Sequence, residues 1–258
     1  MATAIGFPRI HHVVYPESDG LPMAESDFQR KPLTYAVEAL SLYFQDRPDI
    51  YVSGNMLIYY EEGNPKAVVA PDVFVVCGTT KQDRSSYFVW REPKGPDFVL
   101  EITSKSTRGE DQGPKKGTYA FLGVQEYVQY DPTEDYLKPP LKGFHLVGDN
   151  YQPIPTLEQP DGTLILHSAV LGLDVRLQDG VFHFVEPATG RPLLTYSEAD
   201  AARQAAEQER LVAEQARLAA EQARLAAENQ LQAEVTARIA AEARIAELEA
   251  RLRRLEQS

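Results

Sequence analysis

The sequence is poor in residues that could cross-link the chain or hold it in a membrane. It has a single cysteine, Cys77, inside an apolar run, so no disulfide bond can form within one chain. This scarcity is typical of a reducing compartment. The first 20 residues contain neither a basic start nor a continuous apolar run, so we expect no signal peptide and no membrane anchor. A cytoplasmic protein is therefore predicted.

Positive charge is also scarce. The chain has 26 Lys and Arg against 38 Asp and Glu, a formal net charge of -12 at pH 7. Residues 1–196 hold 17 of the basic and 26 of the acidic residues, so the acidity lies mainly in the part expected to be globular. A protein that coats nucleic acid regardless of sequence needs surplus positive charge, so this class is disfavoured. An enzyme that contacts DNA around one site remains compatible with this charge.

Several motifs of other chemistries are missing. The five histidines do not have the spacing of a zinc site, and a single cysteine cannot complete one. The sequence has no glycine-rich phosphate-binding motif. Ser104 and Ser106 have no histidine nearby, so a hydrolase triad is not expected. Carboxylates and lysines are left as the candidates for chemistry.

The first half of the chain alternates helical and strand patterns. Residues 1–30, rich in proline, serine and acids, predict an irregular arm. Residues 31–45 have apolar side chains at helical spacing, and two short strands follow. The runs PDVFVVC and DFVLEITSKST are β-branched and aromatic, which predicts two buried strands. A helix, a turn at Gly123 and a third strand then lead to Pro132.

Beyond Pro132 the pattern indicates antiparallel hairpins. One is expected to turn at residues 148–150, and another at Asp179–Gly180, a dipeptide favoured in type I′ turns. Residues 31–196 thus predict an α/β or α+β fold. We expect a mixed β-sheet core flanked by helices and followed by antiparallel hairpins.

The composition changes at Ser197, where an alanine-rich segment containing the repeat AEQARLA begins. Leucines recur every seven residues, although the residues four later are polar, and near the end apolar residues step by four and three. A helix of about 60 residues would be about 90 Å long and could not bury its apolar stripe alone. Residues 197–258 therefore predict a long helix that forms a homo-oligomer through a coiled coil. A solvated single helix, or one folded back onto the domain, is the alternative.

Two carboxylates fall on the predicted buried strands: Asp72 at the start of the first and Glu101 within the second. A buried carboxylate is costly unless a metal ion or a salt bridge compensates it. Mg²⁺ prefers one or two carboxylates together with water and phosphate oxygens. It can polarise a phosphate and lower the pKa of an attacking water. Asp72 and Glu101 are therefore candidate metal ligands, with a salt bridge as the alternative.

The stretch from Pro71 to Pro132 resembles the PD-(D/E)XK nuclease superfamily and, within it, the Uma-two family of restriction endonucleases. The matching residues are Pro71-Asp72, Glu101-Ile102-Thr103-Ser104, Ser106-Thr107, Asp111, Lys115, Tyr119, Gly123-Val124-Gln125-Glu126-Tyr127 and Asp131-Pro132. The likeness covers roughly residues 20–195. It implies a restriction-endonuclease-like core in which Asp72 and Glu101 hold Mg²⁺ or Mn²⁺ and DNA is the substrate, although the residues do not distinguish DNA from RNA.

The lysine departs from the superfamily pattern, which places it two residues after the acid, where this chain has Thr103. The resemblance to the Uma-two family implies a lysine on the following helix, so Lys115 is the preferred candidate. Its role would be to stabilise charge on the phosphate or to orient the water. Lys105, on the same strand face as Glu101, is the alternative.

Two more acids are candidates for an accessory role. Glu38 lies on the first predicted helix, where an exposed or capping role is expected first. Asp111 would share a helical face with Lys115 and Tyr119. Lys116 points about 100° away from that face and is expected to be solvated.

Two functions follow from this reading. The preferred one is a Mg²⁺-dependent endonuclease that uses Asp72, Glu101 and Lys115 and is dimeric or higher through residues 197–258. The alternative is a catalytically inactive interaction or assembly protein that keeps the nuclease fold and oligomerises through its coiled coil. The acidic surface and Thr103 at the usual lysine position favour that alternative.

Overall fold

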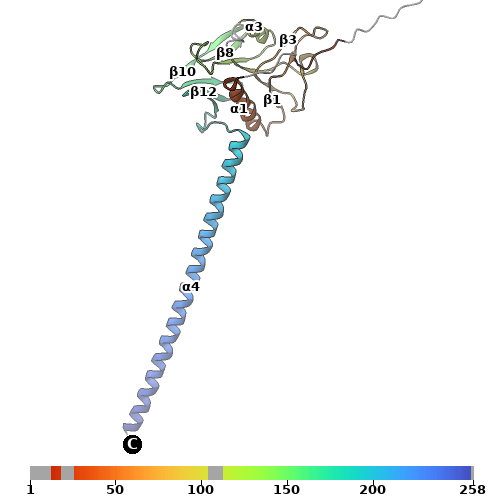
Figure 1. Cartoon of the computed structure of the whole chain (residues 1–258). Coiled ribbons are helices and arrows are strands. Elements are labelled where there is room, and N and C mark those ends of the chain that lie inside the picture. The colour runs from red at the N-terminus through yellow and green to blue at the C-terminus, as the bar shows by residue number, and fades with distance from the viewer. Residues whose placement is uncertain (1–12, 19–25, 104–112, 257–258) are drawn as a thin grey trace, which may run out of the picture. The chain divides into compact units, whose positions relative to one another are not determined.

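The structure is a computed structural model that describes residues 13–18, 26–103 and 113–256. Contacts divide the chain into two compact units, Met1–Ser197 and Glu198–Ser258 (Figure 1). The first unit contains the sheets and the short helices. The second is helical throughout its described part.

The first unit begins with a helix and continues mainly as strands. In chain order its first elements are α1 (Asp27–Tyr43), β1 (Ile50–Gly54), β2 (Ile58–Tyr59), β3 (Val68–Val69), β4 (Val73–Cys77), β5 (Tyr87–Phe88) and the 3-10 turn η1 (Val89–Arg91). Next come β6 (Phe98–Ile102), α3 (Pro114–Phe121) and β7 (Glu126–Tyr130). The last strands are β8 (Leu141–Val147), β9 (Asn150–Ile154), β10 (Thr156–Glu158), β11 (Leu164–Ser168), β12 (Leu173–Gln178) and β13 (Val181–Val185).

Six strands form the central sheet in the order β1-β4-β6-β7-β8-β9. Strands β6 and β7 are parallel, and the other neighbouring pairs are antiparallel. Strands β10 to β13 form a second, antiparallel sheet, and β3, β2 and β5 form a small third one. The predicted mixed sheet with helices, later hairpins and a long terminal helix is confirmed.

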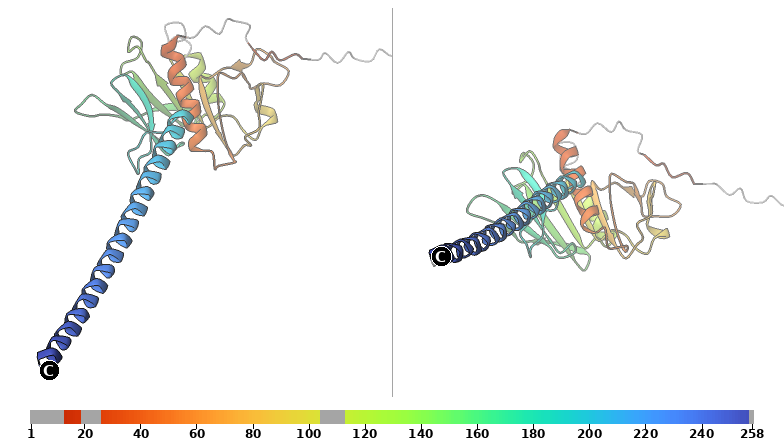
Figure 2. Two further views of the ribbon diagram at one scale, coloured as in Figure 1. Left: turned by 60° about the horizontal axis from the view of Figure 1, so that its bottom comes forward. Right: turned by 90° about the horizontal axis from the view of Figure 1, so that it is seen from below.

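The central sheet separates two apolar cores. On one face Leu100 and Ile102 pack with side chains of α1 and of the second sheet. On the other face Val99 and Tyr127 pack with Tyr119 of α3. Because successive side chains of a strand point to opposite faces, Glu101 of β6 lies on the α3 face. The views in Figure 2 show α1 lying against the strands of this unit.

The close approach of the two larger sheets depends on a glycine. A Cβ added to Gly143 of β8 would lie 2.3 Å from a methyl carbon of Leu166 on β11. Real contacts of this kind are not so short, so a larger residue would displace the Leu166 side chain. Glycine at this position therefore lets Leu166 fill the space against the central sheet.

Helix α1 begins earlier than the sequence suggests. It starts at Asp27, whereas the pattern predicts a start near Lys31 because Pro32 is typical of a first turn. An additional turn precedes the proline, and an ion pair of 2.6 Å between Arg30 and Asp27 bridges it. Residues 27–30 thus belong to the helix rather than to an irregular arm.

Both predicted hairpins are present. Strands β8 and β9 are joined at Gly148, which has a φ of 60°, and β12 and β13 are joined by Asp179 and Gly180. The φ angles of that second pair, 51° and 73°, are both positive, as a type I′ turn requires. The dipeptide therefore sets the register of the β12–β13 pair.

The second unit is the helix α4 (Tyr196–Glu256), which has 61 residues and confirms the predicted long helix. From Asp200 onward every side chain that the structure describes is exposed. Neighbouring acidic and basic side chains form ion pairs along its surface, such as Arg217 with Glu214 at 2.8 Å. Within the described ranges, no helix combines the length and the apolar character needed to cross a membrane.

Candidate active site

Glu101 is a buried carboxylate with two partners on one helix. Its side chain is 1% exposed on β6. One carboxylate oxygen accepts a hydrogen bond of 2.5 Å from the Tyr119 hydroxyl, and the other lies 3.0 Å from Nζ of Lys115. Lys115 and Tyr119 are four residues apart on α3, so they share a face of that helix. The cost of burying the carboxylate is offset by one positive charge and one hydroxyl.

Helix α3 is held in place by Tyr119. The helix opens with Pro114 in its first turn, where the missing N–H has no cost, and Gly123 follows its end with a φ of 74°. The Tyr119 ring is fully buried, and its centroid lies 5.3 Å from that of Tyr127. Burial raises the pKa of the Tyr119 hydroxyl well above its usual range, and the Glu101 carboxylate raises it further. The hydroxyl therefore stays protonated and donates to Glu101.

Asp72 lies beside Glu101 across the strand pair. The register pairs Val73 of β4 with Leu100 of β6, and one further step places Asp72 opposite Glu101 on the same face. An Asp72 carboxylate oxygen accepts a hydrogen bond of 2.6 Å from the backbone N–H of Ile102. This side chain therefore binds β6 just beyond the last backbone pair of β4 and β6. A Cβ on Gly54 would lie 2.3 Å from the Asp72 carbonyl oxygen, so glycine is needed beside it.

A third polar side chain stands in the same row. Gln129 of β7 is directly paired with Glu101 in the parallel register and is 2% exposed. Its Nε2 donates to the Tyr127 hydroxyl at 3.0 Å. Gln129 was not among the site residues predicted from the sequence. The available signal was a glutamine within the otherwise aromatic and aliphatic part of the strand EYVQY.

The predicted trio of Asp72, Glu101 and Lys115 thus comes from three elements that meet on one face of the central sheet. Thr103 directly follows β6 and is buried. It occupies the position, two residues after the acid, where the superfamily pattern has its lysine. Lys105 and Asp111, the alternative lysine and one accessory acid, lie outside the described residues.

Glu38 does not join the site. It is half-buried on α1, whose buried side chains pack in the core on the other face of the sheet. In the part of the chain that the structure describes, no three Asp, Glu, His or Cys side chains form a group suited to a metal ion. Glu38 therefore does not combine with Asp72 and Glu101 into such a group.

Lys116 is half-buried, whereas the sequence predicts a solvated side chain. Its Nζ lies 3.4 Å from the ring centroid of Phe144 on β8, and the two side chains form a cation–π contact. Burial lowers the pKa of Lys116, and the neighbouring Lys142 lowers it further. The prediction was wrong because the helical wheel gives the direction of a side chain but not the aromatic surface that it meets.

The side chains of the site fit a magnesium or manganese ion. Asp72 and Glu101 offer carboxylate oxygens, which these hard cations prefer, and the cluster has no histidine or cysteine among its described residues. Mg²⁺ commonly takes only one or two carboxylates and completes its shell with water and phosphate oxygens. Two facing carboxylates are therefore a sufficient protein contribution.

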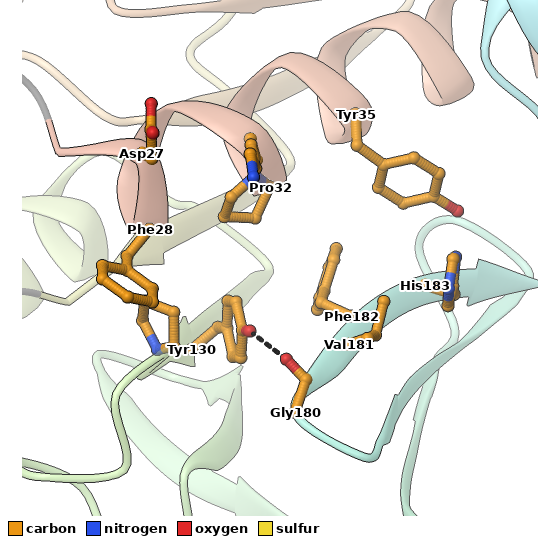
Figure 3. Close-up of a pocket in the computed structure, with 11 residues that line it drawn as sticks. Asp27, Phe28, Pro32, Tyr35, Tyr130, Gly180, Val181, Phe182 and His183 are labelled. Carbon is orange, nitrogen blue, oxygen red and sulfur yellow. Dashed lines mark hydrogen bonds between the residues drawn. The ribbon is translucent and has the colours of Figure 1, made fainter.

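A separate hollow of about 530 Å³ lies on the α1 side of the unit (Figure 3). Its lining is mainly apolar, formed by Phe28, Pro32, Tyr35, Tyr130, Pro132, Val181 and Phe182, with Asp27, Lys31 and His183 adding polar groups. The Tyr130 hydroxyl donates to the Gly180 carbonyl at 3.1 Å across it. The hollow contains a single carboxylate, so the chemistry of a metal-dependent site is better matched by the Glu101 cluster.

Comparison with known proteins gives a matching family model and related solved structures. The family model Uma2, described as "Putative restriction endonuclease", matches residues 19–178. A solved structure of "a putative nuclease belonging to DUF820" from Anabaena variabilis ATCC 29413 is similar with a TM-score of 0.39 and 13% sequence identity. That match covers 58% of this chain and 76% of the other chain. No curated protein matches the chain.

Proposed function

We propose, because the chain belongs to the Uma2 family of restriction endonucleases, that it is a metal-dependent endonuclease that hydrolyses DNA phosphodiester bonds. In this proposal Asp72 and Glu101 hold Mg²⁺ or Mn²⁺, and Lys115 assists the reaction. The observation that carries it is the ion pair between Lys115 and the buried Glu101, opposite Asp72.

The residues have separate roles. When bound, the metal ion would polarise the scissile phosphate and lower the pKa of an attacking water. Asp72 and Glu101 bind it through their carboxylates. Tyr119 restricts the rotamer of Glu101 by its hydrogen bond. Lys115 keeps a positive charge beside these carboxylates, where it can attract a phosphate oxygen and stabilise the charge that develops on it.

The position of Lys115 helps to decide between an active nuclease and a catalytically inactive assembly protein. Thr103 at the usual lysine position would remove a catalytic cation if no other residue supplied one. Lys115 reaches the same carboxylate from α3 at 3.0 Å, which supports an active site with its lysine moved to the helix. The net charge of -12 still favours the assembly protein, since it limits general attraction to DNA.

Cleavage of supercoiled plasmid with Mg²⁺ or Mn²⁺ tests the proposal, beside an EDTA control and the variant Asp72→Asn. The parent is expected to nick or linearise the plasmid only with metal. Asn retains an oxygen that can accept the Ile102 N–H but lacks the charge, so the variant should fold and lose activity by about 10²-fold or more. Metal-dependent cleavage by Asp72→Asn at the parent rate would contradict the assignment of Asp72.

Calorimetric titration with Mg²⁺ and Mn²⁺ separates the two functions when no plasmid is cut. Heat that is present in the parent and lost in Asp72→Asn would favour a nuclease whose target sequence the plasmid lacks. No heat in either protein would favour the catalytically inactive assembly protein.

We further propose that the chain forms a homo-oligomer through residues 197–258. The helix α4 is exposed along its described length, and its leucines recur every seven residues, a repeat typical of a coiled coil. Removing residues 197–258 leaves both apolar cores intact, so the truncated protein is expected to fold as a monomer. Light scattering on the parent and the truncated protein measures the change, and an equal number of copies in both would contradict it.

A further inference from the structure

Helix α4 has two periodic features along the same face. Leu211, Leu218 and Leu225 are 48%, 47% and 48% exposed, an unusual state for leucines in a regular row. Four residues after each leucine comes a side chain with an amide group, in the order Gln215, Gln222 and Asn229. In a heptad written abcdefg the leucines occupy d and the amides occupy a.

We propose that α4 pairs with the α4 of a second copy of this chain, parallel and in register. This inference rests on the proposed self-association and adds its orientation. Two observations support it: the alternation of leucines at d with amides at a, and the positions of the charged residues beside them.

The amide layers favour the parallel arrangement. In a parallel pair each a position faces the same a position of its partner, so Gln215 meets Gln215 and Asn229 meets Asn229. Two amides can then donate to and accept from each other within the seam. In an antiparallel pair a faces d, so each amide would be buried against a leucine without a partner. The amide layers thereby favour the parallel orientation, and the pairing of Asn229 with Asn229 favours the in-register arrangement over a shift of one heptad.

The glutamates give an independent argument. Glu214, Glu221 and Glu228 occupy the g positions beside the seam. In a parallel pair g faces e of the partner, where this chain has Val212, Ala219 and Ala226, so no like charges meet. In an antiparallel pair g faces g, which would bring rows of glutamates together. The arginines do not relieve this, because Arg217 and Arg224 occupy outward c positions and pair with Glu214 and Glu228 of their own helix.

The seam continues towards the C-terminus after a change of phase. Ala241, Ile245 and Leu248 step by four and three, with Leu248 at d and 45% exposed. Parallel pairing places both copies of the first unit at the same end of the paired helices, since each unit precedes its α4 in the chain. Two candidate active sites would thus lie at one end of the particle, an arrangement suited to cuts on both strands of a duplex.

Disulfide cross-linking tests the orientation in the full-length chain after the replacement Cys77→Ser. Leu211→Cys and Leu248→Cys are made separately at d positions that are about 55 Å apart along a helix. Ala213→Cys, at the outward f position of the same turn as Leu211, is the matched control. After mild oxidation, non-reducing electrophoresis measures the cross-linked dimer.

The proposal expects each leucine variant to cross-link to its own copy and Ala213→Cys to remain largely uncross-linked. No self-cross-linking by either leucine variant, together with a dimeric mass of the parent, would overturn it in favour of antiparallel pairing, because d then faces a rather than d. No cross-linking, together with a monomeric mass of the parent, would overturn pairing altogether. None of these outcomes depends on nuclease activity, so a failure of the proposed reaction is recognised separately by the plasmid assay.

Discussion

Glu101→Gln is expected to abolish metal-dependent cleavage, with a loss of at least about 10³-fold in rate. Glutamine has almost the same shape as glutamate and can still accept the Tyr119 hydroxyl, so the change keeps that hydrogen bond but removes the charge and the oxygen that faces Lys115. The site then presents one carboxylate to the metal ion in place of two. Plasmid nicking measures the loss of cleavage, and calorimetric titration with Mn²⁺ measures the loss of metal binding. Both the cleavage rate and the binding heat are expected to fall.

A paired variant separates this loss from a loss of stability. In Glu101→Gln the ammonium of Lys115, which is only 17% exposed, loses its anionic partner, at a cost of about 1–3 kcal/mol in the free energy of unfolding. Adding Lys115→Met removes the positive charge that faced Glu101, so the double variant should regain part of this stability while remaining inactive. Urea unfolding checks the first part. Cleavage by a folded Glu101→Gln protein near the parent rate would show that this carboxylate is not required.

Lys115→Met is expected to lower cleavage by about 10²- to 10³-fold while metal binding persists. Methionine keeps the unbranched side chain but removes the charge that lies 3.0 Å from Glu101. Asp72 and Glu101 both remain, so titration with Mn²⁺ should still release or absorb heat. Because Glu101 stays buried without its cation, added Mn²⁺ should raise the melting temperature of this variant more than that of the parent.

Lys116→Met is the matched control for Lys115→Met. It removes the same charge from the next position of the same helix, but Lys116 faces Phe144 rather than Glu101. Cleavage by this variant should stay within a few-fold of the parent. Equal losses in both variants would point to a general effect of positive charge on DNA attraction and would remove the specific role given to Lys115.

Local chemistry made much of the fold predictable. The strand around Glu101 is apolar on both faces because it lies between two cores. Its β-branched and aromatic residues were therefore sufficient to predict a buried strand. Asp179–Gly180 was sufficient for its hairpin because few residues other than Asn, Asp and Gly adopt two consecutive positive φ angles. These signals lie within a few residues of the element they specify.

Features that depend on distant partners were not predictable in this way. The position of Lys116 is set by Phe144, 28 residues further along the chain. Gln129 joins the row of polar side chains only because β7 lies parallel to β6 in one register. Strand order and register are properties of the whole sheet, so a single sequence left them open.

Because Lys115 and Tyr119 lie on one helix, their positions relative to Glu101 depend on the length of the segment between them. The two groups contact a single carboxylate because they are one helical turn apart. An inserted residue between them would rotate one group by about 100° relative to the other, so neither insertion nor deletion is tolerable within that turn. Substitutions elsewhere on α3 leave this phase unchanged. The four-residue spacing from Lys115 to Tyr119 is therefore needed for both groups to contact Glu101 at once.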